Sequence, residues 1–161
     1  TMNSNQFIVI NDLKEFGAKE IFSNTEKIEI SKNPMKQEDW KAARMTENLV
    51  DISIQHSEKY TPHMLNMDVI DGISFQKGCY VGQEVVARTE HIGRVKRRVI
   101  VYELDSTDLK LDDKLFHNGK DTGAQIISIA GIMMMAMINI TFKEKSLQYE
   151  GGNAIPFKAK L

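Results

Sequence analysis

Residues 132–142 read Ile-Met-Met-Met-Ala-Met-Ile-Asn-Ile-Thr-Phe, and this apolar stretch is the part of the sequence that most strongly determines the fold. Thioethers bind soft copper ions and form adaptable surfaces, so the Met cluster is open to a metal or partner interpretation. Core packing is favoured because Met is usually buried and Ile132, Ile138 and Ile140 flank the cluster. We therefore predict a buried strand over Ile132–Phe142.

Turn signals and further β patterns surround this stretch. Asp112-Asp113, Asn118-Gly119 and Gly151-Gly152-Asn153 are typical of turns. The segments between them predict additional strands at Arg97–Leu104, Lys114–His117, Gly123–Ala130 and near Ala154–Phe157. The back of the chain is therefore expected to be all β, and it meets an α+β front near His91–Arg94.

The front of the chain has weaker patterns. A helix is predicted from about Pro34 to Asn48, because Asn33-Pro34 supplies a cap and a first-turn proline. The other predicted elements are a strand at Gln6–Ile10, a short helix capped by Asn11 with Leu13 and Phe16 on one side, and a strand at Lys27–Ser31. Residues 50–87 show no regular hydrophobic pattern, and glycines and a proline interrupt this stretch.

Composition limits the class of protein. The 161 residues are 42% hydrophobic and 27% charged, with a formal net charge of -1, which fits one globular domain or two small ones. A single Cys excludes an intrachain disulfide. No apolar run approaches the roughly 20 residues of a membrane span, and residues 1–6 lack the features of a signal peptide. A cytoplasmic location without membrane partners is expected.

Charge is unevenly distributed along the chain. Gln76–Arg98 contains two acidic residues and six basic ones, namely Lys77, Arg88, Arg94, Lys96, Arg97 and Arg98. This segment of net charge +4 in an acidic background indicates an anionic ligand or surface. The alternative is that these are solvated side chains that protect a strand edge from pairing.

The chemically densest segment is Ile73–Arg88, within which residues 77–84 read Lys-Gly-Cys-Tyr-Val-Gly-Gln-Glu. Gly78 and Gly82 allow a tight loop that aims polar side chains in one direction. Lys77 would favour the thiolate of an exposed Cys79. The alternative is a β-turn that leads into a strand at Glu84–Arg88, with Cys79 acting as a small hydrophobic residue.

This segment resembles the K-G-C-Y-x-G-Q-E signature of the YgfZ family of folate-binding iron–sulfur proteins, which is related to the aminomethyltransferase (T-protein) of glycine cleavage. The family's flanking pattern is matched by these residues: Trp40-x-x-x-Arg44, Pro62, Asn66, Gly72-Ile73-Ser74-Phe75, Ala87-Arg88 and Gly93-x-x-Lys96-Arg97. The resemblance is close over residues 40–98 and architectural over the last sixty residues.

The resemblance implies an α+β fold in which ferredoxin-like modules and a C-terminal β-barrel enclose a channel for tetrahydrofolate. Residues 1–90 would be a partial ferredoxin-like folate-binding module, and residues 91–161 a small antiparallel, aminomethyltransferase-like barrel. The family's first module has no counterpart before Gln6 in this chain. A fragment, a proteolysed product or a short relative is therefore expected.

The implied function is a tetrahydrofolate-binding accessory role in the assembly or repair of iron–sulfur clusters, including those of tRNA-modifying enzymes. Cys79 would be the functional thiol, tuned by Lys77, and folate and iron–sulfur client or assembly proteins would be the partners. Candidate cofactor-binding residues are Trp40, Arg44, His63, Tyr80, Gln83 and Glu84. The basic residues from Arg88 to Arg98 would attract a polyglutamate tail.

Trp40 and Arg44 are four residues apart and share a helix face, so an indole could stack on a pterin while a guanidinium meets a carboxylate. The alternative for Trp40 is packing beside Met35, Ala43 and Met45. His63 departs from the family, which usually has Gln or Glu after the proline, and an imidazole cannot copy the paired contacts of a carboxylate. His63 is either a ligand contact or an exposed loop residue.

Other functions are open. The chain could be an aminomethyltransferase that transfers a one-carbon unit to tetrahydrofolate, although independent turnover is not expected. An RNA-binding module would use the basic segment, but direct nucleic-acid binding is not expected because no recognition motif accompanies it. Four scattered histidines and one Cys form no metal-binding spacing, so no resident metal is predicted and any iron–sulfur cluster would be transient or shared.

Overall fold

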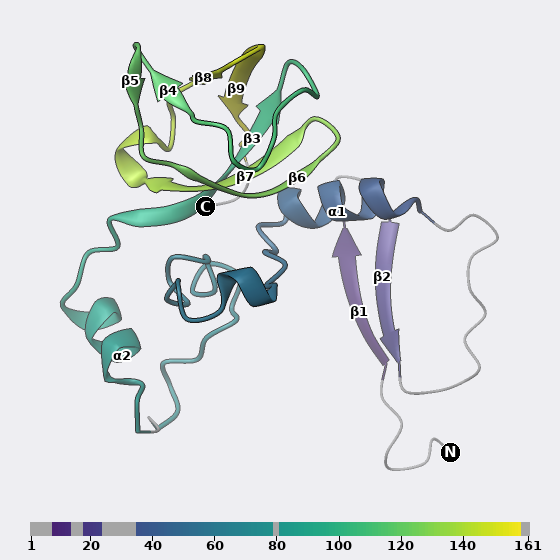
Figure 1. Ribbon diagram of the computed structural model, residues 1–161. Helices are drawn as coiled ribbons and strands as arrows, with labels where there is room; N and C mark the ends of the chain where they lie inside the picture. The colour runs from purple at the N-terminus through teal and green to yellow at the C-terminus, as the bar shows by residue number, and fades with distance from the viewer. Residues whose placement is uncertain (1–7, 14–17, 24–34, 79–80, 159–161) are drawn as a thin grey trace.

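The computed structural model describes residues 8–13, 18–23, 35–78 and 81–158, which form a mixed α/β structure dominated by one curled sheet (Figure 1). Seven antiparallel strands follow the spatial order β5-β4-β8-β9-β3-β7-β6 and curl into a half-barrel. Their bounds are β3 Arg97–Leu104, β4 Phe116–His117, β5 Lys120–Asp121, β6 Gln125–Ala130, β7 Met133–Asn139, β8 Leu147–Tyr149 and β9 Gly152–Pro156. The half-barrel is compatible with the predicted barrel.

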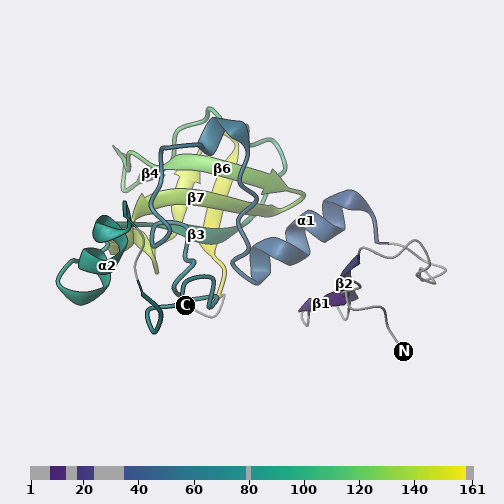
Figure 2. The same cartoon turned by 90° about the horizontal axis from the view of Figure 1, so that it is seen from below.

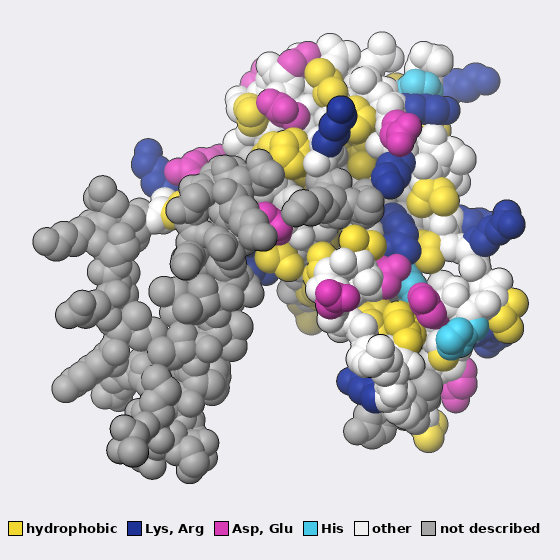
Figure 3. Space-filling view, turned by 180° about the vertical axis from the view of Figure 1, so that it is seen from behind, with side chains coloured by type: hydrophobic (Ala, Val, Ile, Leu, Met, Phe, Trp, Pro, Cys, Tyr) yellow, Lys and Arg dark blue, Asp and Glu magenta, His cyan; other side chains and the backbone are white. Residues whose placement is uncertain are grey.

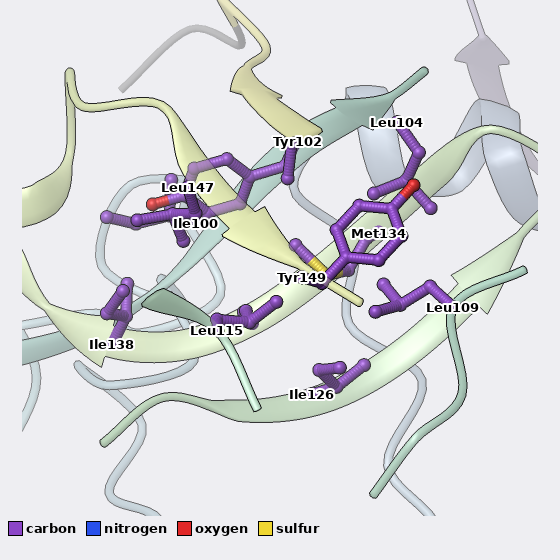
Figure 4. Close-up of a cluster of buried hydrophobic side chains, with 12 residues drawn as sticks. Ile100, Tyr102, Leu104, Leu109, Leu115, Ile126, Met134, Ile138, Leu147 and Tyr149 are labelled. Atoms are coloured by element: carbon purple, nitrogen blue, oxygen red, sulfur yellow. The ribbon is translucent and has the colours of Figure 1, made fainter. Parts of the chain in front are cut away.

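The central pair of the sheet is β3 and β7, which pair from Arg97 opposite Asn139 to Glu103 opposite Met133. Alternate side chains of β7 pack into two separate clusters. Met134, Ala136 and Ile138 point into the half-barrel, where they join Tyr102, Leu115 and Leu147 (Figure 4). The intervening residues Met133, Met135 and Met137 pack on the outer face. The predicted burial of the Met cluster is confirmed, and β7 is covered on both faces because a second layer lies outside the sheet.

That second layer comes from the front of the chain. The α-helix α1, Gln37–Thr46, and the irregular segment after it cover the outer face of the sheet (Figure 2). The residues that pack there are Ala42, Met45, Val50, Tyr60, Met64, Leu65 and Met67. Their burial removes apolar surface of both layers from water, at about 25 cal/mol per Å², and so joins the front of the chain to the sheet.

Hydrogen bonds join the second layer to the part of the β3 edge that has no strand partner. Strand β9 pairs with β3 only at Tyr102–Leu104, which leaves the earlier part of that edge open. The backbone N–H of Val99 donates to Met64 O at 2.8 Å, and Asn66 Nδ2 donates to Val99 O at 2.7 Å. The loop at residues 64–66 therefore acts as a short substitute strand and satisfies the buried backbone of Val99.

The front elements differ in part from the predictions. The two-stranded hairpin consists of β1, Ile8–Leu13, and β2, Ala18–Ser23. The prediction of a helix after Asn11 is wrong for the residues up to Leu13, because β1 remains paired with β2 through Leu13. Phe16, the cap at Asn33-Pro34 and the strand at Lys27–Ser31 lie outside the described residues. Helix α1 is shorter at both ends than predicted, and the ferredoxin-like module remains a prediction.

The second α-helix, α2, spans Glu84–His91, so the alternative of a strand at Glu84–Arg88 is wrong. Glu84 in the first turn and Arg88 and His91 in the last turn have the charge order that the helix dipole favours. The side-chain hydroxyl of Thr89 donates to Val85 O at 2.7 Å within the helix. A short 3₁₀ helix, η2, lies at Ile54–His56, and a second, η3, follows β7 at Ile140–Phe142.

We expect Asn66→Ala to destabilise the protein by about 2–4 kcal/mol, because the change leaves the buried Val99 carbonyl without its donor and places Ala at a φ of 60°. Urea unfolding followed by circular dichroism measures the change. Asn118→Ala is the matched control, since Asn118 also has a positive φ, of 50°, but is exposed in a turn. A loss for Asn66→Ala no larger than that of the control would contradict the role of the hydrogen bond.

Candidate functional site

The signature segment and α2 enclose a cavity of about 260 Å³. Gly72, Ile73, Ser74, Phe75, Lys77 and Gly78 from the loop, and Gln83, Val86, Ala87 and His91 from the α2 region, line it together with Pro62 and Met67. Its wall therefore combines an aromatic ring, a cation, an amide and a histidine with apolar side chains. Such a mixture suits a ligand with a flat apolar body and polar or anionic substituents.

The glycines of the signature have different roles. Gly82 has a φ of 96°, a conformation that favours glycine. Gly78 lines the cavity and has open space where a Cβ would lie. Cys79 and Tyr80, which carry the most specific predictions, lie outside the described residues. Glu84 is exposed at the start of α2.

Trp40 and Arg44 lie together on α1, as their spacing predicted. The Arg44 guanidinium carbon is 5.0 Å from the centre of the Trp40 ring, and Arg44 Nε and Nη2 donate to Asp51 Oδ1 at 3.1 and 2.9 Å. Arg44 lines a different cavity, of about 210 Å³, which shares Met67 with the signature cavity. Among the predicted site residues, Arg44 therefore lines one cavity and Lys77, Gly78 and Gln83 line the other.

His63 is buried, with 1% of its surface exposed, so the alternative of an exposed loop residue is wrong. Its Nε2 lies 3.3 Å from Glu90 Oε2 on α2, and its ring centre lies 5.8 Å from that of Phe75. Sequence reasoning did not identify Glu90 as a site residue, because it lies 27 positions from its partner and no local pattern connects them.

The basic segment divides into structural and surface cations. Arg98 Nη1 and Nη2 donate to Asp68 Oδ1 and Oδ2 at 2.8 and 2.6 Å, and Nη1 also donates to His63 O at 2.9 Å. Arg97 Nη2 donates to the carbonyl oxygens of Gly123 and Met137. These two arginines therefore bond within the fold. Exposed cations remain at Lys77, Arg88, Arg94 and Lys96.

The ion pair between Asp68 and Arg98 changes the acidity of the carboxyl group. Burial raises the pKa of Asp68, but the hydrogen bonds and positive charge of Arg98 outweigh burial, and the net pKa is lowered. In Figure 3, Lys and Arg, Asp and Glu, and His side chains adjoin one another on the face below the half-barrel. This face combines opposite charges and is not a uniform basic surface.

Part of this amino-acid sequence is similar to the sequences of known proteins. No protein-family model matches the chain. The chain is 35% identical over 104 residues to the tRNA-modifying protein YgfZ of Colwellia psychrerythraea, covering 55% of this chain and 32% of that protein. It is 41% identical over 70 residues to the YgfZ protein of Blochmanniella pennsylvanica, covering 44% of this chain and 20% of that protein.

A further relative is the mitochondrial iron-sulfur cluster assembly factor IBA57 homolog of Aspergillus oryzae, 47% identical over 51 residues, which are 32% of this chain and 11% of that protein. The relatives named by these findings are tRNA-modifying YgfZ proteins and a homolog of an iron-sulfur cluster assembly factor. The resemblance drawn from the sequence is confirmed: over the matched part, the chain is a relative of the YgfZ family. It spans a third or less of the length of these three relatives.

None of the described helices is long and apolar enough to cross a membrane.

Arg98→Met is expected to destabilise the protein at pH 7 by about 2–4 kcal/mol, because it leaves the Asp68 carboxylate partly buried without its cation. The pKa of Asp68 is lowered on folding, so the stabilisation is present above the unfolded pKa, near 3.8, and is lost as pH falls through the folded value. The difference between wild type and variant in urea unfolding should therefore shrink below about pH 4.

Arg94→Met removes an exposed cation from the same segment and provides the control, with an expected change within about 0.5 kcal/mol. A difference for Arg98→Met that stays constant from pH 7 to pH 3 would contradict the assigned ion pair.

Proposed function

We propose that the chain is a tetrahydrofolate-binding accessory protein for the assembly or repair of iron–sulfur clusters, including those of tRNA-modifying enzymes. The observation that carries this proposal is the cavity that the signature loop and α2 enclose together. The names of the relatives support the same direction, since they are called tRNA-modifying proteins and iron-sulfur cluster assembly factors.

The cavity suits one part of a folate molecule. Phe75, 38% exposed, offers an aromatic face to a flat ring, and the Gln83 amide also lines the cavity. The Lys77 ammonium would pair with a carboxylate of the ligand. Cavities for complete ligands are roughly 300–1,000 Å³, so 260 Å³ fits a ring system while the rest of the cofactor extends beyond the rim.

Trp40 and Arg44 extend the proposed site beyond the cavity. Met67 belongs to the walls of both cavities, and the proposed ligand would pass Met67 to reach from the first cavity to the second. The Arg44 guanidinium already lies over the Trp40 ring and bonds to Asp51, so it presents an organised cation and not a mobile one. The expected contribution of this pair is to orient the ligand's remote end.

Cys79 would supply the chemistry of the accessory role. Its neighbour Lys77 is exposed, and a nearby cation favours the thiolate form that binds iron. A single thiol supplies only one of the four ligands that a cluster needs, so other ligands would come from a partner or from small molecules. In this role the chain contacts a cluster in transit and does not hold it permanently.

Lys77→Met should weaken binding of tetrahydrofolate about tenfold, since losing one charge-assisted contact costs roughly 1.5 kcal/mol. Isothermal titration calorimetry gives the affinity, and emission of Trp40, the only tryptophan, reports on the surroundings of Arg44. Lys120→Met, on the distant edge strand β5, is the control and should bind as wild type does. Absence of heat and of any emission change with the wild-type chain would overturn folate binding.

Cys79→Ser should leave tetrahydrofolate affinity unchanged while lowering the activity of an iron–sulfur tRNA-modifying enzyme in cells that depend on this protein, by about tenfold. Thiol labelling of the folded wild-type chain tests the accessibility that this role requires. Labelling that occurs only after unfolding would count against it. An aminomethyltransferase would instead produce turnover with the three partner proteins of glycine cleavage, and no turnover is expected.

A further inference from the structure

A histidine and two carboxylates converge next to the signature cavity. His63 and Asp68 belong to the loop that bonds to β3, and Glu90 belongs to α2. One potential ligand atom from each residue lies within 4.8 Å of the other two. The three side chains differ in exposure: His63 is buried, Asp68 is intermediate and Glu90 is exposed. The cluster is therefore anchored on a buried residue and reachable from solvent on the side of Glu90.

The charges of this cluster are unbalanced. Two carboxylates face one permanent cation, Arg98, so the group carries a net charge of -1 when His63 is neutral. Asp68 is paired with this cation, at 2.6 Å between Arg98 Nη2 and Asp68 Oδ2. Burial of His63 reduces the access of water that would otherwise screen these charges. The cluster consequently attracts an additional positive charge.

The spacing suits a metal ion. His63 Nε2 and Glu90 Oε2 are 3.3 Å apart, longer than the roughly 2.7–2.9 Å of a charge-assisted hydrogen bond. Two ligands of a tetrahedral ion with bonds of about 2.0 Å are about 3.3 Å apart. An Asp68 oxygen lies within 4.8 Å of both atoms, so a small shift of the Asp68 or Glu90 side chain would complete a three-ligand set.

Neighbouring contacts prepare these ligands. Arg98 donates to both oxygens of Asp68 and leaves each with a further lone pair, an arrangement typical of the outer shell of metal sites. The buried Nδ1 of His63 has no hydrogen-bond partner among the described residues, so the polar contact described for this ring is the one that faces Glu90. The ring is further held against Phe75.

We propose that His63, Asp68 and Glu90 form a binding site for one divalent transition-metal cation of the Zn²⁺ type. An imidazole nitrogen with two carboxylate oxygens favours such ions over Mg²⁺ and Ca²⁺, which prefer oxygen ligands throughout. The bound cation joins α2, in which no residue is buried, to the loop that the sheet edge holds. The site therefore fixes the helix that forms one wall of the signature cavity.

The test uses the full-length chain with Cys79→Ser, which removes the thiol as a competing ligand, and titrates it with Zn²⁺ by calorimetry and with Co²⁺ by visible absorption. One ion should bind per chain, without displacement by excess Mg²⁺. Glu90→Gln and His63→Gln in the same background should each weaken binding at least tenfold. Glu103→Gln, an exposed carboxylate on β3, is the control and should leave affinity unchanged.

Circular dichroism establishes whether each variant is folded. If the buried change His63→Gln prevents folding, Glu90→Gln still tests the site, because Glu90 is exposed. Equal affinities of Glu90→Gln and Glu103→Gln would overturn the site. So would binding in the wild-type chain that disappears with Cys79→Ser, which places the ion on the thiol. Absence of Zn²⁺ binding to the wild-type chain would also overturn it.

Discussion

The pairing of the loop at residues 64–66 with the open edge of β3 is the interaction on which the candidate sites depend. Strand β9 stops short of Val99, whose backbone is buried and must find partners elsewhere. Met64 and Asn66 supply them. His63 and Asp68 flank these positions, so the same hydrogen bonds that complete the sheet edge also place a buried imidazole and a carboxylate beside α2.

Burial of the sheet on both faces explains why its central strands were the most predictable part of the fold. A strand covered on both faces needs apolar residues at nearly every position, and β3 and β7 therefore stand out in the sequence as continuous apolar runs. The predicted bounds of β3 agree with the structure. The short strands β5 and β8 were missed because two or three residues are too few to show an alternation. Val85 and Val86 favoured a strand by composition, yet they lie in an exposed helix.

The sequence indicated the segment that lines the candidate cavity, but not the contacts around that cavity. Chemically mixed residues at fixed spacing identified the signature loop, and the structure shows that this loop walls a cavity. The contacts that shape the surroundings join residues 27 to 30 positions apart, such as His63 with Glu90 and Asp68 with Arg98. No local periodicity reports pairs at such separations. Charge counting also treated Arg97 and Arg98 as surface cations, although both bond within the fold.

Helix α2 links the cavity to the polar cluster. Val86 and Ala87 face the cavity, and Glu90, one turn further along the helix, meets His63. With no buried residue of its own, the helix has little packing to hold it in one position when these contacts change. A ligand in the cavity and a contact at Glu90 therefore act on the same element, and linkage requires that any effect of one on the affinity for the other be reciprocal. The signature cavity and the buried His63 are therefore coupled through α2, an exposed helix of about two turns.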